Sequence, residues 1–341
     1  MATINKHEGK WQAQVCVNGV RRSKTFLKKD DARRWAERTQ ADLQAGRASR
    51  PTLTLAELCA EYERAVVPTK NNQRYDCLKL RWWAATPLGG RRVVDIMPKD
   101  LQSFVDSRLD EVQPSSARRE FVLLQAVMTW AVKKGWLPES PCKGVEKPQD
   151  NPPRDRVVTD EELARLLQSS GWSEGAVPAT STQRVMAAFL LSCLTGMRGG
   201  EIVRLTGEMM DLDAGVIYLP ASITKTRRKR AVACGARAIE ILRCVQAAGM
   251  KPEIFGLTDA RRDVLFRKIR DRAGIVATPT AALLHFHDAR ATFCTWAASP
   301  GEDGAPRLDV LSLAKQLGHQ NIKQLMTYYR PRAEDLAKRL K

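Results

Sequence analysis

The sequence lacks most of the features that mark membrane, secreted and metal-dependent proteins. Its longest apolar run, Val185 to Leu194, is far too short to cross a bilayer. Its N-terminus does not have the pattern of a signal peptide. Its eight cysteines are scattered without a C-x-x-C pair, which argues against a disulfide framework and against a zinc site. We therefore expect a soluble protein with reduced thiols and no membrane partner.

Acidic residues are scarce relative to basic ones. The chain of 341 residues has 56 Lys and Arg against 38 Asp and Glu, a formal net charge of +18. Such an excess attracts polyanions, and nucleic acid is the simplest polyanionic partner. A generally cationic surface that serves solubility is the alternative. The length suggests two or three domains.

Residues 1–48 have the pattern of a separate small module. Two strand-like runs flank Asn18-Gly19, the strongest short signal for a β-hairpin, and a helix follows them. The module has 11 Lys and Arg against 5 Asp and Glu. Because a small basic sheet can enter the major groove of DNA, we expect Arg21, Arg22 and Lys24 to contact DNA. A folded cap or a protein-contact module is the alternative.

Residues 49–136 have the pattern of an all-helical domain. Thr54-x-x-Glu57 is a capping box that predicts the start of its first helix, and further helices with apolar faces follow. Arg118 and Arg119 are candidates for phosphate contacts, although an ordinary solvated helix face would also place them at the surface.

A linker is predicted over residues 147–157. Five prolines lie between Pro138 and Pro153, and that density excludes a helix or a central strand. An extended linker between two basic domains would let them close around a duplex. Residues 158–341 then form the last domain with its C-terminal tail. The predicted fold class is multidomain and mainly α, with a small β-sheet plus helix at the N-terminus and a small sheet in the last domain.

Histidine and tyrosine are the scarcest polar side chains, and they gather in one place. The chain has only four His and five Tyr, yet three His and two adjacent Tyr fall between Leu284 and Tyr329. A basic chain does not need its few His and Tyr in one window. We interpret the gathering as an active site.

The polar residues of the last domain suit phosphoryl transfer. Two guanidinium groups can grip one phosphate, a phenol can attack phosphorus, histidine can move a proton, and lysine can protonate a leaving oxygen. The sequence has neither a carboxylate cluster typical of Mg²⁺ sites nor the G-x-x-x-x-G-K loop that binds ATP. We therefore expect a transesterification through a phosphotyrosine, with no cofactor and no metal. The candidates are Arg198, Lys225, His287, Arg290, His319 and Tyr328.

Each candidate alone has an ordinary alternative. Arg198 and Glu201, three residues apart on one helical face, could form a simple ion pair, and the L-G-H segment could be a helix C-cap. Lys225 is one of five cations in six residues, so composition cannot single it out. The remaining cations of this run are expected to contact DNA; they are Arg227, Arg228, Lys229 and Arg230.

The order of these motifs resembles the signature of tyrosine recombinases, in particular phage or genomic-island integrases. That signature is Arg in T-G-M-R-G-G-E, Lys in I-T-K-T, H-D-A-R, L-G-H and then Tyr. The family places its tyrosine nine residues after the histidine of L-G-H, which selects Tyr328 over Tyr329. Residues 1–48 are also similar to the arm-type DNA-binding domains of such integrases, and residues 52–146 to their core-binding domain.

The resemblance implies a role for each candidate. Tyr328 would be the nucleophile and would leave a 3′-phosphotyrosine and a free 5′-hydroxyl. Arg198 and Arg290 would clamp the scissile phosphate, and Lys225, on a β-hairpin, would be the general acid. The supporting residues would be His287 for proton transfer, His319 for a hydrogen bond to the phosphate, and Glu201 for the orientation of its neighbours.

The resemblance also implies partners and leaves alternatives. Integration or excision of a mobile element would require double-stranded DNA with attachment sites and a homotetramer on DNA. An excisionase and a DNA-bending protein are candidate accessory partners, and the bacterial cytoplasm, at the nucleoid, is the expected location. A type IB topoisomerase, a Xer-type resolvase and a non-catalytic DNA-binding regulator are the alternatives.

Overall fold

The protein is described from a computed structural model, and it divides into two compact units, Met1–Pro152 and Pro153–Lys341. The division lies inside the predicted linker 147–157, whereas the three-domain organisation stays a prediction. The described residues are 2–7, 9–17, 20–44, 53–70, 72–151, 156–279, 281–301, 305–319 and 325.

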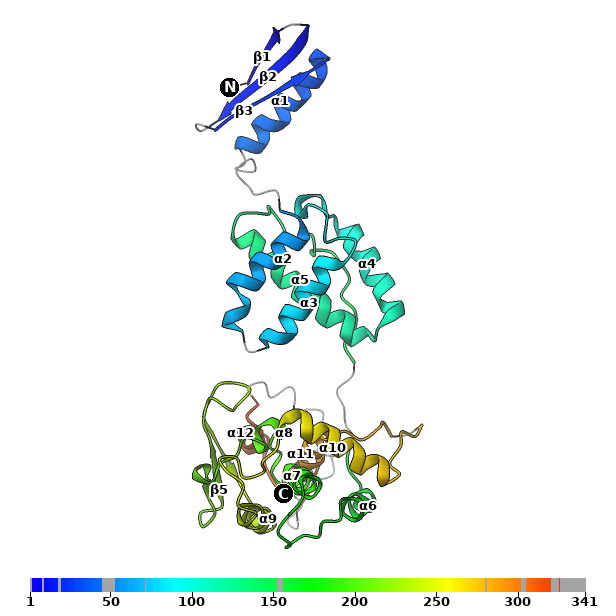
Figure 1. Cartoon of the computed structure of the whole chain (residues 1–341), viewed down its shortest axis with the longest axis vertical. Coiled ribbons are helices and arrows are strands. Elements are labelled where there is room, and N and C mark those ends of the chain that lie inside the picture. The colour runs from blue at the N-terminus through cyan, green and yellow to red at the C-terminus, as the bar shows by residue number, and fades with distance from the viewer. Residues whose placement is uncertain are drawn as a thin grey trace, which may run out of the picture. The chain divides into compact units, whose positions relative to one another are not determined.

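The first unit begins with a three-stranded antiparallel sheet covered by one helix (Figure 1). Val17 pairs with Val20, so the predicted two-residue hairpin forms, although Asn18 and Gly19 themselves lie outside the described residues. A small apolar core of Ala13, Val15 and two alanines of the helix holds the two layers together. The elements are β1 (Ala2–His7), β2 (Lys10–Val17), β3 (Val20–Phe26) and α1 (Lys29–Gln44).

Four helices make up the rest of this unit. The Thr54–Glu57 capping box forms as predicted, because the Thr54 N–H donates to the Glu57 carboxylate at 2.8 Å and the Glu57 N–H donates to the Thr54 hydroxyl at 3.2 Å. The apolar faces of the four helices enclose a core that is separate from that of the sheet. The helices are α2 (Leu55–Ala65), α3 (Gln73–Ala85), α4 (Pro98–Glu111) and α5 (Pro114–Lys133), with short 3₁₀ turns η2 (Val67–Thr69) and η3 (Val93–Asp95).

The second unit is built around a buried helix, α7. Its residues from Val185 to Leu191 are all buried, and α9, α10 and α11 pack against it. A small antiparallel sheet flanks this helical body (Figure 1). The helices are α6 (Asp160–Ser170), α7 (Ser181–Thr195), α8 (Gly199–Ile202), α9 (Ala236–Ala247), α10 (Asp259–Arg272), α11 (Asp288–Ala298) and α12 (Val310–Leu317). The 3₁₀ turn η4 (Gly207–Met209) precedes the strands β4 (Met210–Asp211), β5 (Val216–Leu219) and β6 (Arg230–Ala233).

The predicted fold class is confirmed, since the chain is multidomain and mainly helical with two small antiparallel sheets among the described residues. Within that part of the chain, every helix is too short or too polar to cross a membrane.

Candidate active site

Arg198 is placed by the sharp end of α7. The helix stops at Gly196, which has a φ of +67°, and a Cβ there would come within 2.5 Å of Leu317 and of Phe293. Only glycine fits this turn, because the left-handed backbone and the close packing both exclude a side chain. Arg198 follows two residues later and is the N-cap of the short helix α8.

Arg290 lies one helical turn beyond His287, at the start of α11. The side chain is buried, with 5% relative exposure. Its guanidinium donates to the carbonyl of Gly196 and, at 2.7 Å, to the carbonyl of Leu317. Burial is tolerated here because backbone carbonyls replace the lost water.

The C-terminus of α12 brings the two arginines together. The Leu317 carbonyl that accepts from Arg290 also accepts from Arg198 at 3.3 Å. Gly318, with a φ of +66°, then ends the helix and leads directly to His319. Segments that are 119 residues apart in sequence therefore meet at one carbonyl.

Glu201 is the carboxylate of this cluster, and it bridges two arginines. Its side chain, 2% exposed, accepts from the Arg198 side chain at 3.2 Å and from the Arg198 N–H at 3.0 Å. It also pairs with Arg230. The predicted orienting role of Glu201 stays a proposal, and this bridge is the contact that supports it.

Arg230 differs from the prediction that placed it among the DNA-binding cations. Its side chain is 9% exposed, donates to the Gln316 carbonyl and pairs with Glu201. Arg230 is the first residue of β6. A guanidinium held in this way does not offer a free surface charge to a phosphate, so we withdraw it from the predicted DNA contacts.

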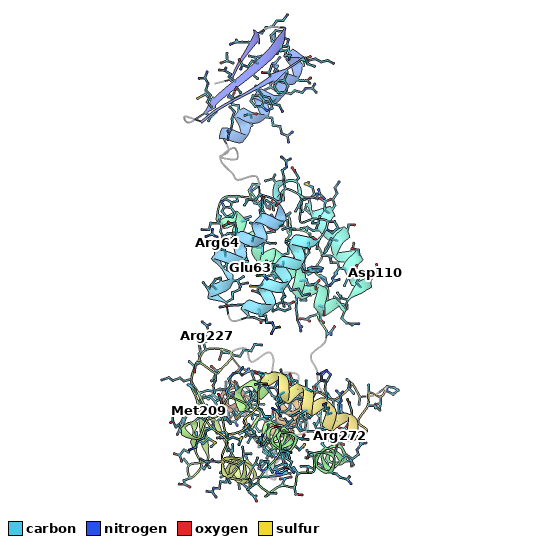
Figure 2. All side chains as sticks on the ribbon, viewed as in Figure 1. Glu63, Arg64, Asp110, Met209, Arg227 and Arg272 are labelled. Carbon is cyan, nitrogen blue, oxygen red and sulfur yellow. The ribbon has the colours of Figure 1, made fainter. Side chains whose placement is uncertain are left out.

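Lys225 lies in the exposed loop that joins β5 to β6. The neighbouring Thr224 is buried and organises the loop, because its hydroxyl donates to the Arg228 carbonyl at 2.8 Å and accepts from the Arg228 N–H at 3.1 Å. Figure 2 shows Arg227 at the outer edge of this loop. Arg227, Arg228 and Lys229 are exposed, as expected of residues that contact DNA.

The positive charges of the site lower the pKa values of its histidines. Partial burial, followed by Arg290 and Arg198, lowers the pKa of His319 to about 4. Partial desolvation, then Arg290, lowers the pKa of His287, and the charge of Lys225 contributes although Asp288 opposes it. Both imidazoles are therefore neutral near pH 7, and each can accept or donate a hydrogen bond.

Arg290 remains a cation in spite of its surroundings. Burial, followed by the charge of Arg198, lowers its pKa to about 9, which is still above neutral pH. The guanidinium groups of Arg198, Arg230 and Arg290 lie near the Glu201 carboxylate, which pairs with Arg198 and Arg230. An anion that enters the site gains from this excess of positive charge.

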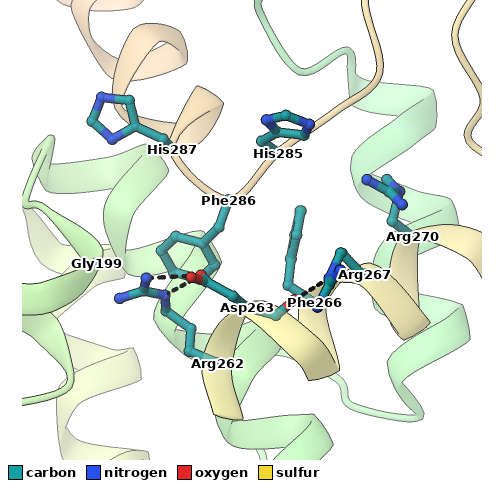
Figure 3. A pocket seen from close by; sticks show the side chains of 9 residues that line it. All are labelled: Gly199, Arg262, Asp263, Phe266, Arg267, Arg270, His285, Phe286 and His287. Atoms are coloured by element: carbon teal, nitrogen blue, oxygen red, sulfur yellow. Dashed lines mark hydrogen bonds and ion pairs between the residues drawn. The ribbon is translucent and has the colours of Figure 1, made fainter. Parts of the chain in front are cut away.

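A pocket of about 570 Å³ adjoins this cluster on the side of α10 (Figure 3). His285 and His287 lie on one side of it, opposite side chains of α10. Arg262 stacks over Phe286 at 4.9 Å from the ring centroid and pairs with Asp259 and Asp263. No sequence motif marks Arg262, since its place depends on this packing.

The three predicted DNA-binding cations of β3 lie on two different faces of the sheet. In β3, Arg22 and Lys24 pair with Val15 and Ala13, so they share the face that α1 covers and reach solvent at the edge strand. Arg21 lies on the opposite, uncovered face, where it donates to Gln14 at 2.6 Å. The prediction treated these three residues as one group, whereas the strand alternation separates them.

The two candidates on α5 also differ from each other. Arg118 donates to the Pro148 carbonyl at 2.8 Å and therefore holds the segment that follows the helix. Arg119 is exposed. Of the pair, Arg119 is the better candidate for a phosphate contact.

The predicted nucleophile, Tyr328, and its neighbour Tyr329 lie outside the described residues. Nearest to them in sequence, Leu325 is buried against α11 and α12.

The chain is similar to known proteins over most of its length. The model of the phage integrase family matches residues 156–335. A putative integrase/recombinase of Haemophilus influenzae is 34% identical over 97% of this chain and 88% of its own length. The shufflon-specific DNA recombinase of Escherichia coli is 27% identical over 84% of this chain and 72% of its own length.

Solved structures show the same fold at low identity. A lambda integrase dimer bound to a COC′ core site has a TM-score of 0.63 and 17% identity, and the match covers 97% of this chain and 95% of that one. The Tn1549 transposon integrase in complex with a circular intermediate DNA has a TM-score of 0.67 and 16% identity, over 84% and 99% of the two chains. A lambda integrase tetramer bound to a Holliday junction has a TM-score of 0.62 and 15% identity, over 95% and 93%.

Proposed function

We propose that this chain, which belongs to the phage integrase family of tyrosine recombinases, cleaves and rejoins DNA through Tyr328 and so integrates or excises a mobile element. Site-specific DNA recombination is the activity of the enzyme. The observation that carries it is the Leu317 carbonyl shared by Arg198 and Arg290. That contact holds two phosphate-binding side chains side by side.

In the proposed cleavage step, the phenolic oxygen of Tyr328 attacks the scissile phosphorus. A phosphorus–oxygen bond to tyrosine forms as the bond to the 5′-oxygen breaks. Arg198 and Arg290 neutralise the negative charge that builds up on the non-bridging oxygens. Lys225 donates a proton to the departing 5′-oxygen, which leaves a 5′-hydroxyl.

The two histidines act in their neutral forms. His287 accepts the phenolic proton of Tyr328, and His319 donates a hydrogen bond to a phosphate oxygen. The lowered pKa values support the neutral form of both rings, and a neutral imidazole has one acceptor nitrogen and one donor. The tyrosine ester preserves the energy of the broken bond. A 5′-hydroxyl from a partner strand can therefore reverse the step without ATP.

The proposed substrate is double-stranded DNA with attachment sites, bound by a homotetramer. Residues 1–48 would bind arm-type sites and residues 52–146 core sites, with the linker 147–157 between the latter and the catalytic domain. The solved lambda integrase tetramer on a Holliday junction supports this assembly as a proposal. An excisionase and a DNA-bending protein would assist the reaction in the bacterial cytoplasm, at the nucleoid.

A trapping assay tests the proposal. Wild type, Tyr328→Phe and Tyr329→Phe are incubated with nicked DNA that carries the attachment core, without Mg²⁺, and resolved on a denaturing gel. A covalent band is expected for wild type and Tyr329→Phe and is expected to be absent for Tyr328→Phe. No band in any lane, on DNA that the protein binds, would favour a non-catalytic regulator.

A further inference from the structure

The side chain of Gln316 connects two backbone segments that lead to catalytic groups. Its Oε1 accepts from the Ala233 N–H at 3.0 Å, and its Nε2 donates to the Ala233 carbonyl at 2.9 Å and to the Thr195 carbonyl at 3.0 Å. Ala233 ends β6, the strand that returns from the Lys225 loop, whereas Thr195 ends α7, just before Gly196 and Arg198. One buried amide therefore joins β6, which returns from the Lys225 loop, to the end of α7, which leads to Arg198.

The backbone carbonyls in the last turn of α12 also hydrogen-bond to the residues that this junction connects. The Gln316 carbonyl accepts from Arg230, at the other end of β6, and the next carbonyl, that of Leu317, accepts from Arg198 and Arg290. The last carbonyls of a helix have no partner within the helix and carry partial negative charge, so they suit guanidinium groups. The end of α12 thus contacts both ends of β6 and both catalytic arginines.

The exposed loop that carries Lys225 depends on this junction for its position. Its residues hydrogen-bond mainly among themselves around Thr224, which fixes the shape of the loop but not its place over the site. That place is set where β6 meets the body of the domain. Both ends of β6 are held there by α12, through Arg230 and through Ala233.

We propose that Gln316 is a positioning residue that holds Lys225 in register with the Arg198–Arg290 pair. The inference rests on the proposed role of Lys225 as the general acid. Glutamine suits the position because a single carboxamide accepts from the Ala233 N–H and also donates to the carbonyls of Ala233 and Thr195. Methionine has no donor and only a weakly accepting sulfur, and an ionised glutamate keeps the acceptor but loses both donors.

The test compares leaving groups. Gln316→Met is assayed for covalent complex formation on nicked DNA with an ordinary scissile phosphate, and on the same DNA with sulfur in place of the bridging 5′-oxygen. A thiolate departs without a proton, so a displaced acid no longer matters on the sulfur substrate. We expect a loss of roughly 10- to 100-fold on the oxygen substrate and a rate within about threefold of wild type on the sulfur substrate.

Controls separate this effect from folding and from the proposed function. Gln246→Met, at an exposed glutamine of α9, should react like wild type on both substrates. If Gln316→Met does not fold, Gln316→Glu, which keeps the length of the side chain, takes its place. It should show the same loss on the oxygen substrate and the same recovery on the sulfur substrate. Circular dichroism and DNA affinity verify that each variant is intact.

Two results would overturn the proposal in different ways. Equal losses on both substrates would mean that Gln316 supports the arginine pair or the fold, and not Lys225. If Lys225→Ala itself stays slow on the sulfur substrate, Lys225 is not the general acid, and the role of Gln316 falls with it. Rescue of Lys225→Ala without rescue of the Gln316 variants leaves the proposed function standing and refutes only the further inference.

Discussion

Single carbonyl and carboxylate groups hold several cations at once in this site. The Leu317 carbonyl accepts hydrogen bonds from Arg198 and Arg290, and the Glu201 carboxylate pairs with Arg198 and Arg230. Shared acceptors fix the guanidinium groups relative to one another before any phosphate arrives. Preorganised donors of this kind stabilise a transition state without reorganising during the reaction.

The first prediction removes the charge of Glu201. Glu201→Gln keeps an acceptor but leaves Arg198 and Arg230 without a carboxylate in a buried setting. We expect a loss of about 1–3 kcal/mol in the free energy of unfolding, and a roughly 10- to 100-fold slower formation of the covalent complex as Arg198 shifts. Denaturant unfolding and the trapping assay measure the two effects. Glu240→Gln, at an exposed carboxylate of α9, is the control and should be neutral.

The second prediction concerns pH. The pKa of His319 is about 4, below its ordinary value of 6.5, so folding disfavours the protonated ring. The stability that this adds is fully present above about pH 6.5 and is lost as the pH falls towards 4. Between about pH 7.5 and pH 5, wild type should lose more thermal stability than His319→Gln, by on the order of 2–4 °C. Equal losses in the two proteins would contradict the lowered pKa.

At the scale of secondary-structure elements, the alternation of β3 decides which cations share a face. The uncovered face of the sheet carries Gln12, Gln14 and Arg21, linked by hydrogen bonds between their side chains. Amide and guanidinium groups of this kind recognise base edges in the major groove. We expect Arg22 and Lys24, on the other face, to contact phosphates from the edge strand.

The third prediction follows from this division. Arg21→Ala should reduce discrimination between a duplex selected by wild type from a random pool and an unrelated duplex, at a cost of about 1–3 kcal/mol. Arg22→Ala should weaken binding to both duplexes equally. Fluorescence anisotropy with the two duplexes measures the ratio of affinities. If Arg22→Ala lowers discrimination and Arg21→Ala does not, the assignment of the faces is wrong.

The elements that the sequence predicted well are those fixed by near neighbours. The Thr54–Glu57 box and the hairpin around Asn18-Gly19 depend on residues two or three positions apart, so their patterns are visible in the chain. Arg198 and Arg290, the proposed phosphate clamp, were expected from their residue types and from a family resemblance, and the structure brings them to one carbonyl.

What escaped prediction depends on contacts between distant segments. Arg230 looks like one more cation in a basic run, yet a carboxylate 29 residues away and a carbonyl 86 residues away draw it inward. Gln316 has no motif at all, because its partners are backbone groups of Thr195 and Ala233. A backbone acceptor leaves no trace in the identity of the residue that provides it.

At the scale of the whole molecule, positive charge is spread along the chain, and the N-terminal module carries part of it. Residues 1–48 contribute +6 of the net +18. Their core is distinct from that of the helices that follow, since its buried residues all belong to the sheet and α1. Removal of the module should therefore leave the remaining cores intact.

The last prediction uses this separation. A protein that begins at residue 49 should still form the covalent complex on core DNA, because Arg198, Lys225, Arg290 and their acceptors all lie in the second unit. It should also bind DNA with a shallower dependence on salt, since each lost phosphate contact removes about 0.9 from the slope of log K against log salt. Titrations at several salt concentrations give that slope for both proteins. An unchanged slope would mean that the module does not touch DNA, and loss of the covalent complex would mean that catalysis needs the module despite its separate core.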